Sequence, residues 1–376
     1  MTMHIVVLGA GYAGLGAAKR AARRLRGTDA RVTLVNMSER FVERVRLHQF
    51  AAGQELADLP LRGLLGGTGV ELVVAGVTGI DPGERVVRLD AAPHEVGYDV
   101  LVYALGSGAD VDAVPGAAEH AFTLATAEGA ARLRSRLAAL PAARSVAVVG
   151  GGLTGIEAAA EFKETQPRLE VQLVCAGPVG DGLVARARRH LHRAFHRLDV
   201  TVREHTPVAE VGPDGLLLED GGELPADVVV WAAGFRVAGL AAAAGLATDE
   251  QGRILVDATL RSRSHPEVFG AGDAAAAHVA GGVARMSCQT SLPMGLRAGD
   301  AVARLVSGRD LRPAGIRHLW QNISLGRRDG VTQFSRADDS PLGPVLTGRA
   351  SARYKEAVTR GTVWRMRHPG PCRPGA

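Results

Sequence analysis

Cysteine is scarce in this sequence, with only Cys175, Cys288 and Cys372 among 376 residues and none of them close to another. This spacing excludes a disulfide scaffold, a CxxC redox pair and a cysteine-rich zinc or iron–sulfur site. Three histidines between residues 190 and 196 have helical spacing, but they lie in an arginine-rich stretch. We therefore expect no metal site, and the odd number of cysteines fits a reducing cytosol.

Long apolar runs are also absent. No run approaches the roughly 20 residues that are needed to cross a bilayer. The apolar N-terminal stretch His4–Leu8 has no basic segment before it and no small-residue cleavage site after it. We therefore expect an untargeted, cytoplasmic protein without a transmembrane segment.

Positive charge is concentrated at one end of the chain. Residues 348–376 hold seven basic groups and one acid, whereas the other 347 residues carry 37 basic and 38 acidic groups. Because the excess is local, we expect no nucleic-acid partner. For the tail itself, three hypotheses stay open: a solvated basic helix near Ser351–Val363 that covers the N-terminal domain, peripheral contact with anionic lipid, and a docking face for an acidic protein.

Glycine, in contrast, is abundant. The chain contains 48 glycines, while its hydrophobic fraction of 46% and charged fraction of 22% are ordinary for a globular protein. Glycine is favoured where the backbone turns tightly or approaches a ligand closely. The length predicts two domains with a terminal appendage.

The first glycine-rich motif stands between a strand and a helix. The expected strand Ile5–Leu8 leads into Gly9–Gly14, then into an alanine-rich helix over Leu15–Leu25, and a second strand follows at Arg31–Asn36. This order is the context that the dinucleotide-binding fingerprint requires.

Each position of this motif has a physical role. Gly9 makes the tight turn, Gly11 lets the backbone approach a pyrophosphate, and Gly14 allows the helix to pack closely on the strand. The helix N-terminus then offers free N–H groups to the phosphates. Asn36 stands where an acid usually binds the ribose hydroxyls, so it can form hydrogen bonds there but lacks the charge.

A second copy of the motif follows 141 residues later. It comprises the strand Ser145–Val149, the loop Gly150–Gly155, the helix Ile156–Phe162 and the strand Val171–Cys175. Two complete strand-loop-helix units in one chain predict two bound dinucleotides.

Each copy later reaches an apolar strand that ends in a small-residue turn, at Val100–Ser107 and at Val228–Phe235. A further motif, His265–Ala276, contains Gly272-Asp273. It resembles the second FAD motif of flavoproteins that bind two dinucleotides, in which the aspartate binds the ribityl chain. An alternative is that Asp273 caps a following alanine-rich helix.

Together these motifs resemble the pyridine nucleotide-disulfide oxidoreductase superfamily over residues 3–310. The resemblance implies an α/β fold with two doubly wound Rossmann-like domains, one for FAD and an inserted one for NAD(P), plus a small C-terminal α+β region that contributes to the far face of the flavin. The implied boundaries are 1–112 and 249–310 for the FAD domain, 113–248 for the NAD(P) domain and 311–376 for the C-terminal region.

The resemblance also implies the cofactor contacts. The expected cofactor-binding residues are Gly9, Gly11, Tyr12, Ala13, Gly14, Asn36, Arg44, Val77, Ala104, Leu105, Gly106, Gly272, Asp273, Gln289, Thr290, Gly150, Gly152, Thr154, Gly155 and Gly234.

The superfamily's redox cysteine pair is missing. The helix that should carry it, Phe41–Gly53, has no cysteine, so disulfide reductases are excluded. Its Leu47-His48-Gln49 segment is similar to type II NADH dehydrogenases, with His48 at a usually aromatic place. The Met286–Thr290 segment resembles that family's flavin- and quinone-facing segment. Sulfide:quinone reductases need thiols at the flavin, and Cys288 lacks an evident partner.

Two residues are candidates for catalysis. His48 suits proton delivery near pH 7, with packing against the flavin as the alternative. Glu157 matches the family's glutamate near the nicotinamide and flavin, and its alternative is an acid supported by the helix dipole.

The sequence does not favour NADH or NADPH. Cys175 stands where an NADH-specific acid would lie. The arginines of Arg186–Arg189 either reach a 2′-phosphate or form a basic helix face.

We therefore expect hydride transfer from NAD(P)H to FAD and electron delivery to a small-molecule acceptor, with a quinone favoured by resemblance. Two other functions stay open: a flavoenzyme that oxidises an organic substrate, and a redox-sensing protein similar to apoptosis-inducing factor. The sequence leaves open whether the protein forms a homodimer.

Overall fold

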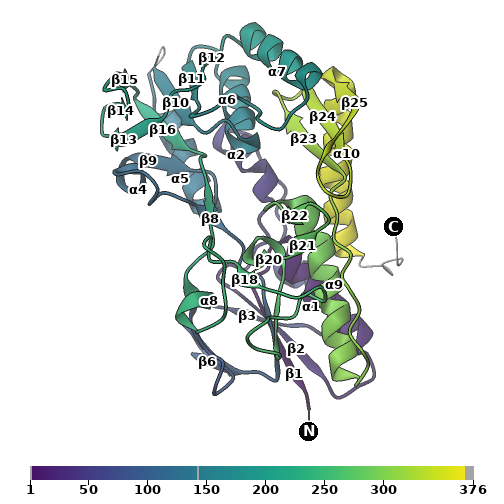
Figure 1. Ribbon diagram of the computed structural model, residues 1–376. Helices are drawn as coiled ribbons and strands as arrows, with labels where there is room; N and C mark the ends of the chain where they lie inside the picture. Colours follow the sequence, from purple (N-terminus) through teal and green to yellow (C-terminus); the bar gives the residue numbers. More distant parts are fainter. Residues whose placement is uncertain (1, 142–143, 369–376) are drawn as a thin grey trace.

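Two parallel sheets organise the computed structural model, which describes residues 2–141 and 144–368 (Figure 1). The first sheet, in the order β19-β7-β1-β2-β3, lies in the lower half of Figure 1, and the second, β12-β11-β10-β16-β9, lies in the upper half. The first contains β1 (His4–Leu8), β2 (Arg31–Asn36), β3 (Glu71–Val74), β7 (Val100–Tyr103) and β19 (Val268–Gly270). The second contains β9 (Ala121–Thr123), β10 (Ser145–Val149), β11 (Glu170–Val174), β12 (Thr201–Arg203) and β16 (Val228–Trp231).

The strands form where short runs of valine, isoleucine and leucine can be buried on both faces. After its first residue, every residue of β1 and of β10 is buried, and all four residues of β7 and β16 are buried. Continuous apolar runs of this kind are typical of parallel strands that are covered by helices or loops on both sides. The predicted fold class, with two Rossmann-like units, is confirmed.

The duplication extends beyond the glycine motifs. Each half also carries a three-stranded antiparallel sheet, which is inserted in the chain between two parallel strands. The insertion lies between β3 and β7 in the first half and between β12 and β16 in the second. These sheets are β4 (Val77–Asp81), β5 (Val86–Leu89) and β6 (Glu95–Gly97) in the first half, and β13 (Val208–Gly212), β14 (Gly215–Leu218) and β15 (Glu223–Pro225) in the second.

The helices after the two glycine loops are α1 (Tyr12–Arg24) and α6 (Leu153–Thr165). Each begins three residues earlier than expected, because the third fingerprint glycine lies inside the first turn and the second glycine is the N-cap. A long C-terminal helix of the first half, α9 (Cys288–Val306), packs on α1. A Cβ on Gly299 would lie 2.6 Å from the Ala17 carbonyl oxygen, so small residues permit this close contact.

The chain crosses between the halves at a pair of short strands. β8 (Gly108–Ala109) pairs antiparallel with β17 (Phe235–Arg236) at the waist of the molecule in Figure 1. Arg236 also forms an ion pair with Asp112 (Nη1 to Oδ2, 3.2 Å). The first crossing lies next to the predicted boundary after residue 112, and the boundaries themselves stay a prediction.

The short helix α2 (Leu47–Ala51) belongs to the first half in sequence but packs into the second. Leu47 and Ala51 lie in the hydrophobic core of the second half, against α5 (Ala127–Ala138) and α6. The remaining elements are η1 (Arg44–Arg46), α3 (Leu61–Leu65), α4 (Ala117–His120), α7 (Ala185–Leu198), α8 (Leu240–Ala243), β18 (Ile254–Leu255), η2 (Gly272–Ala274), β20 (Ala275–Ala276), β21 (His278–Val279) and β22 (Gly282–Val283).

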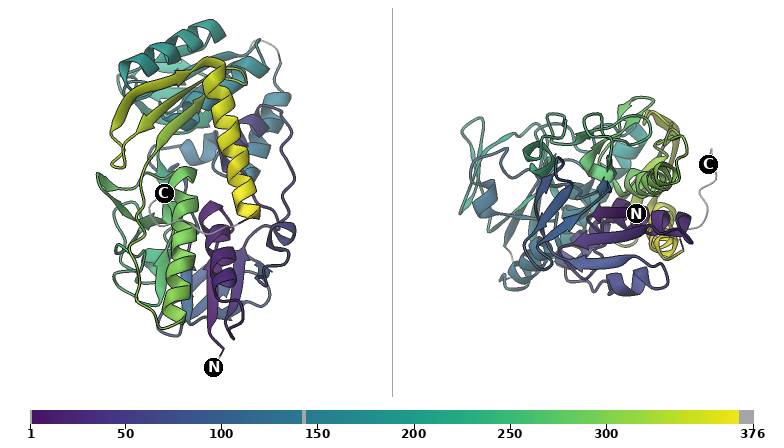
Figure 2. Two further views of the ribbon diagram at one scale, coloured as in Figure 1. Left: turned by 90° about the vertical axis from the view of Figure 1, so that its right-hand side faces the viewer. Right: turned by 90° about the horizontal axis from the view of Figure 1, so that it is seen from below.

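The C-terminal region spans both halves. Its sheet, β23 (Trp320–Ser324), β24 (Gly330–Ser335) and β25 (Pro341–Thr347), contributes Ile323 and Val331 to the second core. Its helix α10 (Gly348–Arg367) then runs back along the first half, where Met366 joins the first core (Figure 2).

The helix is longer than the expected Ser351–Val363, and it lies along the first half, as the hypothesis of a basic helix that covers this domain expects. Its buried residues are Ser351 and Met366, and the side chains between them are partly or fully exposed. The last part of the basic tail, residues 369–376 with Cys372 and Arg373, lies outside the described residues. Within the part of the chain that the structure describes, no helix has the length and apolar character needed to cross a membrane.

A buried ion pair locks α1 to α9. Arg20 is 1% exposed and donates to Asp300 through Nε (2.8 Å) and Nη2 (3.0 Å), and Arg24 Nε donates to the same carboxylate at 2.8 Å. Burial opposes ionisation of Asp300, but the hydrogen bonds from both arginines outweigh it and hold the pKa of this carboxyl below its usual value.

We expect Asp300→Ala to lower the free energy of unfolding by about 3–5 kcal/mol, because it removes the carboxylate that balances the charge of the buried Arg20 guanidinium. Urea unfolding at pH 7 measures this loss. Since the folded pKa of Asp300 is lowered, its contribution is present above the unfolded pKa of about 3.9 and is lost as the pH falls through the folded value. The exposed Asp310→Asn is the control, with a change within about 0.5 kcal/mol. An equal effect of both variants would contradict the role of the ion pair.

Candidate active site

The first glycine loop has the geometry of a dinucleotide cradle. Gly9 has a φ of +89°, and a Cβ at this position would lie 2.5 Å from the Ala104 carbonyl oxygen. A Cβ on Gly14 would overlap the Gly9 carbonyl oxygen, whereas a Cβ on Gly11 would meet no atom within 4 Å. Glycine at positions 9 and 14 therefore allows the loop to fold. Glycine at position 11 leaves open space at the N-terminus of α1, where N–H groups attract phosphate.

The second glycine loop repeats this geometry. Gly150 has a φ of +125°, and its Cβ would lie 2.7 Å from the Ala232 carbonyl oxygen. A Cβ on Gly155 would overlap the Gly150 carbonyl oxygen, and one on Gly152 would meet nothing. Of the other residues expected here, Thr154 lies in the first turn of α6 and Gly234 follows β16 with a φ of +76°.

The side chain of Asn36 forms two hydrogen bonds to the protein backbone that the sequence does not predict. Its Oδ1 accepts from the Ala10 N–H (2.8 Å), and its Nδ2 donates to the Ser38 carbonyl (2.8 Å). The side chain therefore ties the glycine loop to the end of β2. A contact with ribose stays a prediction, and it would use the remaining lone pair of Oδ1 or the second hydrogen of Nδ2.

Asp273 is the centre of a polar group at the carboxyl edge of the first sheet. Its Oδ2 accepts from Ser107 Oγ (2.8 Å) and its Oδ1 from Ser291 Oγ (3.2 Å). Arg44 Nη1 lies 3.6 Å from the same carboxylate and donates to the Ser107 carbonyl (2.7 Å). Loops after β7 and β19 and the helix α9 thus meet at one carboxylate.

The alternative role of Asp273 as a helix cap is wrong. No alanine-rich helix follows it, because Gly272–Ala274 form the short helix η2 and Ala275–Ala276 form the strand β20. Ala275 and Ala276 pair with β18, so their backbone hydrogen bonds are made in a sheet instead.

The other residues expected at FAD lie around this cradle. Tyr12 and Ala13 begin α1, Ala104, Leu105 and Gly106 follow β7, Thr290 lies in the first turn of α9, and Val77 begins β4. A Cβ on Gly272 would lie 2.9 Å from the Ala13 side chain, so η2 and α1 approach closely. The space above Gly11, the free helix N-terminus and the partly buried Asp273 carboxylate together fit an adenine dinucleotide with a flavin.

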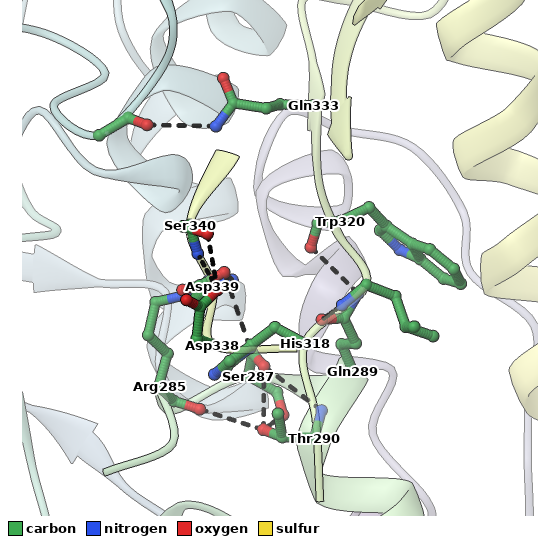
Figure 3. A network of polar contacts seen from close by, with 12 residues as sticks. Arg285, Ser287, Gln289, Thr290, His318, Trp320, Gln333, Asp338, Asp339 and Ser340 are labelled. Carbon is green, nitrogen blue, oxygen red and sulfur yellow. Dashed lines mark hydrogen bonds and ion pairs between the residues drawn. The ribbon is translucent and has the colours of Figure 1, made fainter. Parts of the chain in front are cut away.

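Gln289 has a structural partner that the sequence did not predict. Its Nε2 donates to the Trp320 carbonyl (3.0 Å), and its Oε1 accepts from the Leu319 N–H (3.2 Å), as Figure 3 shows. This amide therefore fastens the start of α9 to the C-terminal region. In the same network, Arg285 forms an ion pair with Asp339, which links two hairpins.

Glu157 lies in a buried ion pair that crosses from the second half to α10. Lys355 of α10 donates to Glu157 Oε1, and the Ser324 N–H (2.9 Å) and Oγ (3.1 Å) donate to the same oxygen. Burial opposes ionisation of Glu157, but Lys355, His48 and these hydrogen bonds lower the pKa of its carboxyl. The sequence did not reveal Lys355, because it lies 198 residues from Glu157.

His48 is buried beside this ion pair. Its Nδ1 lies 3.8 Å from Glu157 Oε2 and its Nε2 lies 4.0 Å from Glu161 Oε2. Burial lowers the pKa of the imidazole to about 3, so the expectation that His48 titrates near pH 7 is wrong. The ring is neutral at pH 7, and its buried Nε2 has no hydrogen-bond partner among the described residues.

Glu161 is a second buried acid that sequence reasoning missed. It lies one turn after Glu157 on α6, its side chain is 0% exposed, and it accepts from Gln54 Nε2 and from Arg327 Nε (3.1 Å). Burial raises the pKa of Glu161 despite these two partners. The spacing of four residues from Glu157 is the only signal in the sequence.

A cavity of about 660 Å³ adjoins this cluster. It lies between segment 43–59, the turn 324–327 and α10, and we call it the α10 cavity. Gln49, Gln54, Arg327 and Lys355 line it, together with apolar side chains such as Val363. The predicted Leu47-His48-Gln49 segment therefore contributes Gln49 to the cavity wall and His48 to the cluster behind it.

The loop after β11 has no acid at the strand end. Cys175 is buried there, and burial together with Glu204 raises the pKa of its thiol to about 11. Glu204, just beyond the end of β12, accepts from the Val179 N–H at 2.6 Å. The Glu204 carboxylate thus reaches this loop from the end of the neighbouring strand β12. Its position 29 residues after Cys175 explains why the sequence motif did not indicate it.

Helix α7 is a basic surface helix. Its buried residues are Ala187, Leu191, Ala194 and Phe195, and the arginines of Arg186–Arg189 lie outside this buried set. His190 Nε2 contacts Asp329 Oδ1 at 2.7 Å. Among the described residues, no group of three or more His, Cys, Asp or Glu could hold a metal ion.

Comparison with known proteins places the chain in a family. The model of the pyridine nucleotide-disulphide oxidoreductase family matches residues 3–295. The chain belongs to this family. It is 38% identical over 319 residues to an NADH dehydrogenase-like protein of Mycobacterium tuberculosis, with 78% of each chain covered. It is 27% identical to the type II NADH:quinone oxidoreductase of Staphylococcus epidermidis, over 96% of this chain and 95% of the other.

Solved structures show the same fold. NDH2 of Plasmodium falciparum in complex with NADH superposes with a TM-score of 0.80 at 14% identity, covering 98% of this chain and 96% of that one. The sulfide:quinone oxidoreductase of Aquifex aeolicus has a TM-score of 0.80 at 20% identity, covering 97% and 92%. Family membership confirms the resemblance, the oxidoreductase class and the cofactors FAD and pyridine nucleotide. The individual contact residues stay predictions.

The two kinds of glycine should respond differently to substitution. Gly11→Val adds a side chain where no protein atom is near, so the FAD-free protein should keep its thermal stability but bind much less FAD. Gly14→Val forces a side chain onto the Gly9 carbonyl and should destabilise the FAD-free protein by at least about 1–3 kcal/mol. Bound FAD per chain and the unfolding of the FAD-free proteins measure the two effects. Normal FAD content in Gly11→Val would contradict the cradle.

Proposed function

We propose that the protein is an FAD-dependent NAD(P)H:acceptor oxidoreductase that reduces a quinone in the α10 cavity. The observation that carries this proposal is the position of the cavity against the Glu157–Lys355 ion pair, on the helix that follows the second glycine loop. One helix thereby connects the expected nucleotide site to the cavity. The relatives named as NADH:quinone oxidoreductases support the choice of acceptor.

The chain's own residues bind and orient the reactants. Residues at Gly9–Gly14 and Asp273 would hold FAD, and Gly150–Gly155 would hold the nucleotide. Bound FAD would accept a hydride from the nicotinamide and supply two electrons to the acceptor. The protein contributes orientation and a fixed electrostatic environment to this transfer.

Lys355 is suited to bind a carbonyl acceptor. An ammonium group has three N–H donors, and Lys355 uses two of them on Glu157 Oε1 and Ser324 Oγ. The third donor has no acceptor among the described residues, so it could bind a quinone oxygen as negative charge develops there. Apolar residues such as Leu59 and Val363 in the cavity wall suit the ring.

A thiol-dependent reaction finds less support. Cys175 and Cys288 are both free cysteines, and burial raises the pKa of each thiol to about 11. A thiol of this kind is a poor nucleophile near pH 7. The similarity to the sulfide:quinone oxidoreductase, at 20% identity, is one of fold.

Anaerobic stopped flow tests the function directly. NADH or NADPH should bleach the flavin absorbance, and a short-chain quinone should then restore it. Flavin reduction by an organic substrate in the absence of either nucleotide would favour the substrate-oxidising enzyme. A long-lived reduced complex with a change of assembly, but without turnover, would favour the redox sensor. No bleaching by either nucleotide would refute the proposal.

We expect His48→Ala to slow acceptor reduction by about 100-fold while flavin reduction by NAD(P)H stays near the wild-type rate, because the imidazole lies behind the cavity wall beside Glu157 and can pass a proton. His48→Phe keeps a ring of similar shape without its nitrogens. If His48 only packs, the phenylalanine variant should recover the wild-type rate. Equal loss of both half-reactions with normal FAD content would show that His48 serves the flavin site as a whole.

A further inference from the structure

We infer that Glu161 stores a proton behind the α10 cavity and passes it through His48 to the Glu157–Lys355 pair when the acceptor is reduced. This inference rests on the proposed function, and it concerns a residue that no sequence motif identified. Glu161 does not line the cavity itself, so it acts through His48 and Glu157.

The three groups form a row. Glu161 Oε2 lies 4.0 Å from His48 Nε2, and His48 Nδ1 lies 3.8 Å from Glu157 Oε2. Glu157 Oε1 binds Lys355, which lines the cavity. Each gap is about 1 Å longer than a hydrogen bond, so side-chain movement of that size completes the row.

The two ring nitrogens of His48 face different carboxyl groups. A neutral imidazole carries a proton on one nitrogen and a lone pair on the other, so it can accept at Nε2 and donate at Nδ1. Such a ring passes a proton without being charged at rest. In the relay, Nε2 accepts the proton from Glu161. This role would explain why Nε2 is buried and has no hydrogen-bond partner among the described residues.

The surrounding charges determine where the proton rests. His48 and Glu161 lie near Glu157 and Glu164 of α6, Lys355 of α10, Arg327 of the β23–β24 turn, Arg46 of η1, and the polar groups of Gln54 and Ser324. Burial raises the pKa of Glu161, whereas Lys355 and the other partners outweigh burial and lower that of Glu157. The proton is therefore held at Glu161 in preference to Glu157.

The reaction requires one proton from the protein. NAD(P)H supplies two electrons and one proton as a hydride, while a quinone takes up two electrons and two protons to become a quinol. The second proton leaves Glu161 for His48 Nε2 as the Nδ1 proton moves to Glu157, and the Glu157–Lys355 pair delivers one proton to the quinone oxygen. Water reprotonates Glu161 on the side of Gln54 and Arg327, which line the cavity.

The test compares Glu161→Gln with Glu164→Gln. Glu164 lies on the same helix and its Oε2 accepts from the Arg327 N–H (2.6 Å), but it is not part of the row. Glu161→Gln should slow acceptor reduction by about 100-fold. Wild-type acceptor reduction should slow as the pH rises through the pKa of Glu161, and this pH dependence should disappear in Glu161→Gln. It should persist in Glu164→Gln at a lower pH, because the charge of Glu164 helps to raise the pKa of Glu161. Glu161→Asp keeps the carboxyl and should retain the pH dependence at a shifted pH.

Infrared spectroscopy of the FAD-loaded protein tests the stored proton without any acceptor. A protonated carboxyl band should titrate in the wild type and in Glu164→Gln, and it should be missing in Glu161→Gln. If the band is unchanged in Glu161→Gln, the inference is refuted even where quinone reduction succeeds. If the band behaves as expected but no quinone is reduced, the proton store stands and the proposed function fails. A Glu161→Gln protein with the wild-type rate and pH dependence would also refute the relay.

Discussion

The ion pair between Glu157 and Lys355 is the interaction on which the site depends. It brings Lys355, which is partly exposed at the cavity wall, against the buried carboxylate of Glu157, which is costly to bury without a partner. Removing Lys355 would leave Glu157 buried beside a neutral imidazole, while Glu161 would keep its ion pair with Arg327. The pair thus holds α10 against α6 and thereby forms one wall of the α10 cavity.

The local parts of the fold follow from short stretches of sequence. The turn at Gly9 and the close packing at Gly14 depend only on atoms of the same strand-loop-helix unit and the next parallel strand. The same is true of the second copy at Gly150 and Gly155. The glycines that this geometry requires stand within six residues of one another in each motif, although Gly9 meets Ala104 and Gly150 meets Ala232 at the end of the neighbouring strand. The two Rossmann-like units could therefore be predicted from the motifs.

The site is encoded over long distances, and this part could not be predicted. Glu157 meets Lys355 across 198 residues, and Glu161 meets Arg327 across 166. No periodicity or motif links these positions, because their contacts exist only once the C-terminal sheet has packed on α6. The pKa of His48 was misjudged for the same reason: the ring is buried by elements that are distant in sequence.

The placement of α10 also changes how its charge should be understood. Counted along the sequence, Lys355 is one member of a basic tail, but in the structure it belongs to the buried cluster and neutralises Glu157. Arg360 and the exposed Trp364 line the cavity farther along the same helix. An acceptor that enters past them meets an arginine and an aromatic surface before it reaches the ammonium of Lys355. One helix therefore supplies both the side chains at the outer part of the cavity and the positive charge beside Glu157, so both features depend on its position against α6.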